Sequence, residues 1–324
     1  MLDASYNFYP ICDLICDRII PINYEVFELK IIPKNLLNEE TPFHEKIIDK
    51  FELADTFIKI SNLKNKFAEI STIKNVISII FIANCFCHDS SLDFEGPLIG
   101  HSLKFFTTKI GSLPIDEEFF EYRIFPYPED KDFSPPFFEK KLYLTENADD
   151  IVGGTKNNAL YYFNKIFDFL EKGTDLSKRL YTCFNIMYEL MYNRIDVNFF
   201  LLSCRILEVL VLNDKDGKKS RISNRCTALI LKNHSVEEKK KLANKIAKLY
   251  KDRSDIVHEG KSYFDFYNEN PNFLNFDIYF AKNLFIRIIE IIIEKNFDTV
   301  EDIKSFTKNS LTNDDVEYYY HSND

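Results

Sequence analysis

The sequence has no tryptophan, only eight glycines among its 324 residues, and no apolar run long enough to cross a membrane. Its longest apolar stretches, residues 76–87 and 285–293, contain polar positions and are shorter than the roughly 20 residues that a transmembrane helix needs. The N-terminus also lacks the basic segment and apolar core of a secretory signal. We therefore expect a soluble protein without a membrane partner.

Cysteines are few and have no paired spacing. The chain has seven, an odd number that fits a reducing cytoplasm better than a disulfide scaffold. Cys85-Phe-Cys87-His88 resembles a set of metal ligands. A structural zinc site needs four ligands, normally from two paired clusters, and no second cluster lies within sequence reach. We expect a cytoplasmic protein without a metal or cofactor.

The charge is unevenly distributed. The whole chain carries a formal charge of −10, which argues against a general nucleic-acid-binding protein. Between Asp214 and Lys261, however, 14 Lys or Arg residues stand against 7 Asp or Glu residues, which gives a local charge of +7. Such a segment is either a local phosphate-binding face or the solvated surface of helices.

The length predicts about two domains, and the two parts of the chain have different patterns. Alternating apolar residues predict strands at 24–33, 103–110 and 119–125, whereas residues 43–66 have a helical rhythm. A boundary region from Pro126 to Gly154 follows, rich in proline near its start. The predicted fold class is α+β, with a strand-containing domain before a helical bundle. The predicted ranges are 1–145 for an α+β sensing, substrate or regulatory domain, 155–312 for an all-α domain, and 313–324 for an acidic tail.

Helices are predicted over most of the second part. Asp175 and Asp196 are candidate N-caps, and Ser235-Val-Glu-Glu238 has the pattern of a capping box. The helix that precedes Leu212 is apolar almost throughout, so it should lie at the centre of the bundle. The predicted helices are residues 158–171, 175–193, 197–212, 220–232, one from Ser235 through Val257, 276–295, and 300–305.

The most informative stretch is Leu249-Tyr-Lys-Asp-Arg-Ser-Asp-Ile-Val-His-Glu-Gly260. Its arginine, Arg253, is a permanent cation that can bind a phosphate through two nitrogen atoms. His258 is the side chain type best suited to move protons near neutral pH. An Arg-x4-His pair is thus a minimal set for cutting RNA without a metal, although the pattern alone is common by chance.

Two earlier segments strengthen this interpretation. The chain has Leu207-Glu208 near the end of a predicted helix, then Arg221-Ile-Ser-Asn-Arg225 followed by Ala228, and then the Arg-x4-His stretch. In order and spacing these segments resemble the HEPN superfamily, most closely its ApeA-like branch from bacterial antiphage and toxin systems. The resemblance covers residues 196–260.

The resemblance implies a HEPN-like helical domain that acts as a metal-independent endoribonuclease and forms a homodimer. It implies catalytic roles for Arg253 and His258, with Ser254 as the polar residue after the arginine. Glu208 and Arg225 match upstream positions with supporting roles. The chain has Glu259 where the family has glycine, and its negative charge would oppose a bound phosphate.

The remaining expected site residues belong to the same segment. Asp255 is a further supporting candidate, and Arg221, Lys251 and Lys261 are candidates for contacts with the substrate. The expected partners are RNA, such as tRNA or another structured RNA, a second copy of the chain, and an antitoxin or phage-derived trigger. The expected function is an RNA-cleaving effector of antiphage defence (abortive infection) or of a toxin–antitoxin system. The alternative is a non-catalytic HEPN-like module for dimerisation or for binding RNA or nucleotide.

The chemistry of RNA is compatible with these residues, because RNA carries its own nucleophile, the 2′-OH. His258 could take the proton of the 2′-OH or give one to the leaving 5′-oxygen, and Arg253 could neutralise the developing phosphate charge. The products would be a 2′,3′-cyclic phosphate and a 5′-OH end.

Helix geometry adds a condition. Residues five apart on a straight helix point about 140° apart, so Arg253 and His258 would not converge in one chain. Either the helix unwinds near Gly260 or a second copy completes the site. A purely structural interpretation is also open, in which the arginine and histidine are buried, cap the helix end and bind carbonyl groups or Glu208.

Overall fold

The computed structural model describes residues 6–11, 14–23, 27–50, 54–61, 66–87, 108–109, 122–123, 142–145, 159–192, 197–213, 218–260 and 279–308. Contacts divide the chain into two compact units, residues 1–88 with 100–163, and residues 89–99 with 164–324. The division falls inside helix α4 (Ala159–Glu171). The predicted acidic tail and most of the predicted boundary region lie outside the described residues.

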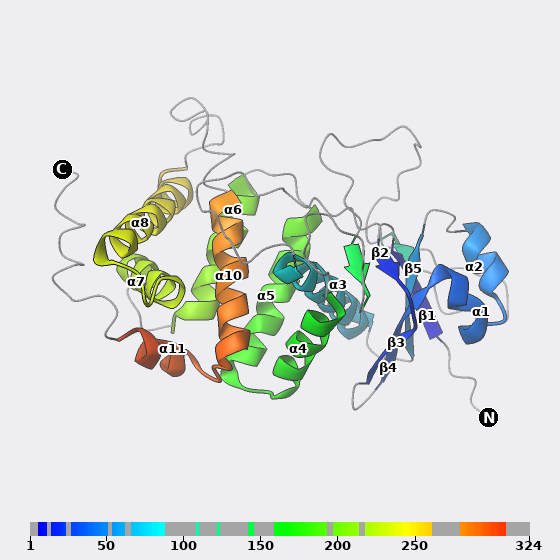
Figure 1. The fold of residues 1–324 in the computed structure, drawn as a ribbon. Helices are drawn as coiled ribbons and strands as arrows, with labels where there is room; N and C mark the ends of the chain where they lie inside the picture. The colour runs from blue at the N-terminus through cyan, green and yellow to red at the C-terminus, as the bar shows by residue number, and fades with distance from the viewer. Residues whose placement is uncertain are drawn as a thin grey trace. The chain divides into compact units, whose positions relative to one another are not determined.

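The first unit contains a four-stranded antiparallel sheet in the order β1-β5-β4-β3 (Figure 1). Two short pairs accompany it, one parallel and one antiparallel. The strands are β1 (Tyr6–Ile11), β2 (Leu14–Cys16), β3 (Ile20–Asn23), β4 (Glu28–Pro33), β5 (Thr56–Ser61), β6 (Thr108–Lys109), β7 (Tyr122–Arg123) and β8 (Leu142–Leu144). With the helical second unit, this sheet confirms the predicted α+β fold class.

The two faces of the sheet follow the alternation of side chains along a strand. On one face, Phe8 and Phe57 pack with Leu37 of α1 (Leu37–Glu40) and Ile47 of α2 (His44–Lys50). A short 3-10 turn, Lys34–Leu36, leads into α1. On the other face, the hydroxyl of Tyr9 donates a hydrogen bond to Glu69 of α3 (Lys66–Cys87). The sheet is therefore covered by α1 and α2 on one side and contacts α3 on the other.

The prediction of a helix across residues 43–66 is wrong in its second half. Helix α2 ends at Lys50, and β5 then occupies the interior of the sheet between β1 and β4. The sequence of β5, Thr-Phe-Ile-Lys-Ile-Ser, has two adjacent apolar residues and so does not alternate strictly. Its pairing with two strands distant in sequence outweighs the local helical rhythm.

The second unit is a bundle of helices with α6 at its centre (Figure 1). Helix α6 contacts α5, α7, α8, α10 and α11, and its buried side chains include Phe200, Ile206 and Leu210. This confirms the predicted central position. The helices after α4 are α5 (Asp175–Tyr192), α6 (Val197–Val211), α7 (Lys218–Ile230), α8 (Val236–Glu259), α10 (Tyr279–Lys295) and α11 (Val300–Thr307).

Two helix starts test the predicted caps. The capping box of α8 is present, since the Ser235 hydroxyl accepts a hydrogen bond from the Glu238 amide and the Glu238 carboxylate accepts one from the Ser235 amide. Hydrogen bonds to its carboxylate from the Ser235 hydroxyl and the Ser235 amide lower the pKa of Glu238 to about 2. At α5 the cap is Thr174 rather than Asp175, because the Thr174 hydroxyl accepts the amide hydrogen of Ser177 at 3.3 Å.

No helix in the described ranges is both long and apolar enough to span a membrane. In α3, most of the side chains that the structure describes are buried.

Candidate functional site

The site is built on the C-terminal half of α8. This helix is continuous from Val236 to Glu259 and ends at Gly260, whose φ of 69° and ψ of 22° lie in the left-handed region that glycine tolerates. Arg253 and His258 both lie before that end, so the helix does not unwind between them. The spacing left two ways to bring the two side chains together, an unwound helix end or a second copy of the chain. The continuous helix excludes the first.

Arg253 and His258 consequently lie on different sides of α8. Arg253 is half-buried beside α6, whereas His258 is exposed in the last helical turn. Five residues at 100° per residue leave their side chains about 140° apart around the axis. Within a single chain, the two residues are not brought together.

Arg253 forms an ion pair with Glu208 of α6. The distance from Arg253 Nη2 to Glu208 Oε1 is 3.2 Å, and the two side chains are 22% and 16% exposed. One turn earlier, the Tyr250 hydroxyl donates to the Cys204 carbonyl at 2.9 Å. These two contacts fasten the end of α8 to α6. The ion pair agrees with the purely structural interpretation, in which the arginine binds Glu208.

The other predicted residues of α8 are distributed by helical position. Ser254, His258 and Glu259 are exposed, Asp255 is half-buried, and Lys251 is exposed on the same side as His258. Because Lys251 and His258 are seven residues apart, they differ by only about 20° around the axis and by about 10 Å along it. The exposed face thus presents one lysine and one histidine together.

The predicted residues outside α8 are not part of this face. Arg221 is exposed on α7, and Lys261 lies outside the described residues. Arg225 is buried, and its guanidinium donates to the carbonyl of Val211 at the end of α6. Arg225 therefore stabilises the C-terminus of α6 and is not part of the exposed surface of α8.

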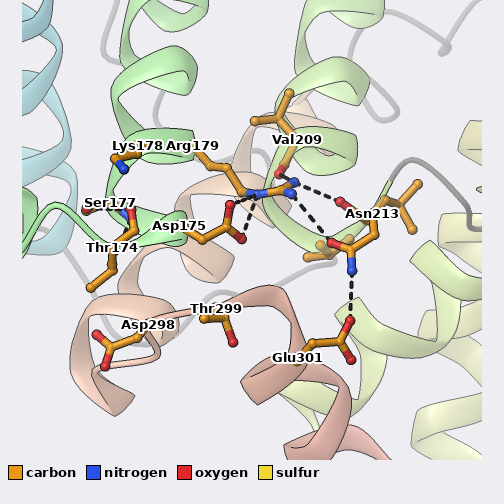
Figure 2. Close-up of polar contacts among 12 residues, drawn as sticks. Thr174, Asp175, Ser177, Lys178, Arg179, Val209, Asn213, Asp298, Thr299 and Glu301 are labelled. Carbon is orange, nitrogen blue, oxygen red and sulfur yellow. Dashed lines mark hydrogen bonds and ion pairs between the residues drawn. The ribbon is translucent and has the colours of Figure 1, made fainter.

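A second arginine, which the sequence did not single out, binds the same helix end (Figure 2). Arg179 of α5 donates from Nη1 to the carbonyls of Val209 at 2.9 Å and Leu212 at 2.8 Å. Its Nε also donates to the carboxylate of Asp175 at 3.0 Å. The last carbonyls of a helix lack partners within the helix and carry a partial negative charge, so two guanidinium groups satisfy and neutralise them.

The environment beneath α8 does not provide an ionised nucleophile. Burial raises the pKa of the Cys204 thiol far above its usual range, and Arg253 only partly offsets this effect. Burial likewise raises the pKa of the Tyr250 hydroxyl. Both groups stay protonated near neutral pH and do not act as ionised nucleophiles.

The Cys85-Phe-Cys87-His88 group falls at the C-terminal end of α3. Cys85 is half-buried, while the side chain of Cys87 and all of His88 lie outside the described residues. In the part of the chain that the structure describes, no three His, Cys, Asp or Glu side chains gather as metal ligands would.

Comparisons with known proteins add no relative. The chain matches no family model, no curated protein and no solved structure at a significant level. The HEPN resemblance therefore remains a prediction that rests on the three sequence segments.

Proposed function

We propose that this protein is a metal-independent, HEPN-like endoribonuclease that cleaves RNA as the effector of a bacterial antiphage or toxin–antitoxin system. The observation that carries the proposal is the end of α8, where His258 is exposed and Arg253, although paired with Glu208, keeps 22% of its side chain exposed. A proton carrier and a phosphate-binding cation thus lie five residues apart on one continuous helix.

The proposed reaction uses only the RNA and these side chains. The 2′-oxygen attacks the adjacent phosphorus, the bond from phosphorus to the 5′-oxygen breaks, and the products are a 2′,3′-cyclic phosphate and a 5′-OH end. His258 in its neutral form accepts the 2′-OH proton, and in its protonated form it supplies the leaving oxygen with a proton. Arg253 stabilises the charge on the phosphate oxygens.

The separation of the two side chains requires a second copy of the chain. A two-fold dimer would bring His258 of one chain toward the partner's Arg253, and symmetry would form two such sites. Val257, next to His258, is 50% exposed and offers an apolar surface for this contact. In this arrangement the first unit senses a trigger, positions RNA or holds the nuclease in check.

The proposal is tested with purified protein and mixed RNAs in EDTA. We expect cleavage by the wild type that is lost in both Arg253→Ala and His258→Ala. Matched controls are Arg205→Ala on α6 and His234→Ala before α8, because both residues are exposed and lie outside the proposed site. Cleavage that survives in Arg253→Ala or His258→Ala would exclude these residues as the catalytic pair.

A second candidate function is a non-catalytic module that dimerises or binds RNA or nucleotide. The observation that favours it is the ion pair with Glu208, because this pair occupies the cation that phosphate would need. RNA binding without cleavage by the wild type would support this candidate.

A further inference from the structure

The ion pair between Arg253 and Glu208 lies on a fixed framework. The hydrogen bond from Tyr250 to the Cys204 carbonyl holds α8 against α6 one turn before the pair on both helices. The pair itself joins a single guanidinium nitrogen to a single carboxylate oxygen at 3.2 Å. Arg253 could therefore exchange its partner by side-chain rotation, without movement of either helix.

The charge around Arg253 is already balanced by carboxylates. Glu208 contacts it, and Asp252, the preceding residue, has a side chain that is only 12% exposed. Lys248 lies 3.8 Å from Asp252, so these four side chains carry no net charge. A phosphate that approached Arg253 in this state would be repelled by the Glu208 carboxylate.

Carboxylate and phosphate are competing ligands for one guanidinium. Both can accept two parallel hydrogen bonds from the same planar group of donors. The Glu208 contact uses one of the two terminal nitrogens, and about a fifth of the Arg253 side chain, 22%, remains exposed. An anion from solvent can therefore reach the group that Glu208 holds.

We infer that Glu208 is an internal competitor that holds Arg253 in a resting state until an RNA phosphate displaces it. This inference rests on the proposed function, since it assigns Arg253 to phosphate. Glu208 acts through Arg253 and is not a catalytic residue. Its carboxylate lowers the affinity of the site for phosphate. It thereby limits cleavage of RNA whose phosphate is not correctly placed at Arg253.

The inference is tested first without RNA, by labelling arginines with phenylglyoxal and measuring the label on each by mass spectrometry. In Glu208→Gln we expect Arg253 to label about twofold to fivefold faster than in the wild type, which corresponds to the loss of one partly exposed ion pair. Inorganic phosphate should slow this labelling more in Glu208→Gln than in the wild type. Equal labelling rates in the two proteins would overturn the inference.

Controls within the same molecule separate release of Arg253 from unfolding. Exposed Arg205 should label equally in both proteins, and buried Arg225 should stay unlabelled while the bundle is folded. Asp252→Asn removes the neighbouring carboxylate and should change Arg253 labelling by less than about twofold, since Asp252 is paired with Lys248 at 3.8 Å. If Glu208→Gln does not fold, Glu208→Asp takes its place, because it keeps the charge on a shorter side chain. Arg253 should then label faster than in the wild type, by a smaller factor than that expected for Glu208→Gln.

RNA cleavage then distinguishes failure of the inference from failure of the proposed function. We expect Glu208→Gln to cleave RNA about twofold to fivefold faster than the wild type, because phosphate no longer competes with a carboxylate. Slower cleavage would mean that Glu208 orients Arg253, and it would overturn the inference while the nuclease assignment stands. Glu208-dependent labelling in a protein that cleaves no RNA would keep Glu208 as the competitor and reject the nuclease.

Discussion

At the scale of the residue, what matters is the partner that each polar side chain has. Lys30 and Lys59 lie directly opposite each other on β4 and β5, where two positive charges would repel. The carboxylate of Glu40 accepts hydrogen bonds from both, at 3.0 Å and 2.8 Å, and removes the repulsion. The same logic applies to Arg253 and Glu208, where the partner also determines whether the cation is available for a ligand.

Asn75 is the contrasting case in α3. Its side chain is fully buried, and neither of its amide atoms has a hydrogen-bond partner among the described residues. Loss of hydration without a compensating hydrogen bond costs about 1–3 kcal/mol. Asn75 should therefore destabilise the first unit.

We predict that Asn75→Leu raises the free energy of unfolding by about 1–2 kcal/mol, because a side chain of similar size replaces an unsatisfied amide. Urea titration followed by circular dichroism measures the change. Asn84→Leu is the matched control, since Asn84 is also buried in α3 but donates to the Ile80 carbonyl at 2.9 Å and should not give the gain. Lower stability of Asn75→Leu would show that its amide has a stabilising partner, such as a bound water.

At the scale of the element, the C-terminus of α6 is the clearest example of helices held by their ends (Figure 2). Arg179 reaches it from α5, and Arg225 reaches it from α7. Asn213, just after α6, donates to Glu301 of α11 at 2.8 Å. Four helices are thus joined at one helix end.

We predict that Arg179→Met lowers the free energy of unfolding by about 2 kcal/mol, because two helix-end carbonyls and the Asp175 carboxylate lose a charged donor. Lys178→Met, at the adjacent exposed position, should change it by less than about 0.5 kcal/mol. Thermal and urea unfolding give both values. Equal effects of the two substitutions would contradict a specific role for Arg179.

Helices were more predictable from sequence than strands. The apolar periodicity and the Ser235–Glu238 capping box are local patterns, and both appear in the structure as expected. Strand β5 was missed because its partners, β1 and β4, are distant in sequence and the local rhythm favoured a helix. Arg179 was missed for a similar reason, since its acceptors Val209 and Leu212 lie 30 and 33 residues away.

The candidate site was predictable only in part. Helical geometry gave the separation of Arg253 from His258, and the continuous α8 agrees with it. The partner of Arg253 was foreseen only as one alternative, because an Arg-x4-His spacing does not specify which carboxylate lies across the helix interface. The buried position of Arg225 could not be read from its basic neighbours.

At the scale of the whole molecule, the basic segment between Asp214 and Lys261 serves two purposes. Several of its cations are used in packing: Lys239 and Arg225 are buried, and Lys245 lies 4.3 Å from the centre of the Phe280 ring. Others, such as Arg221 and Lys251, are exposed. The phosphate-binding face that we propose is therefore smaller than the local charge of +7 suggests.

The central claim is that Arg253 and His258 form a nuclease site across two chains. It is tested most directly by mixing Arg253→Ala protein with His258→Ala protein, after each has been shown to be inactive on RNA in EDTA. In a mixed dimer one composite site keeps both residues, and random pairing predicts recovery of roughly a quarter of wild-type cleavage. Sedimentation of the wild type should show a concentration-dependent dimer over the same range. A mixture that stays inactive while such dimers exchange subunits would contradict the shared site.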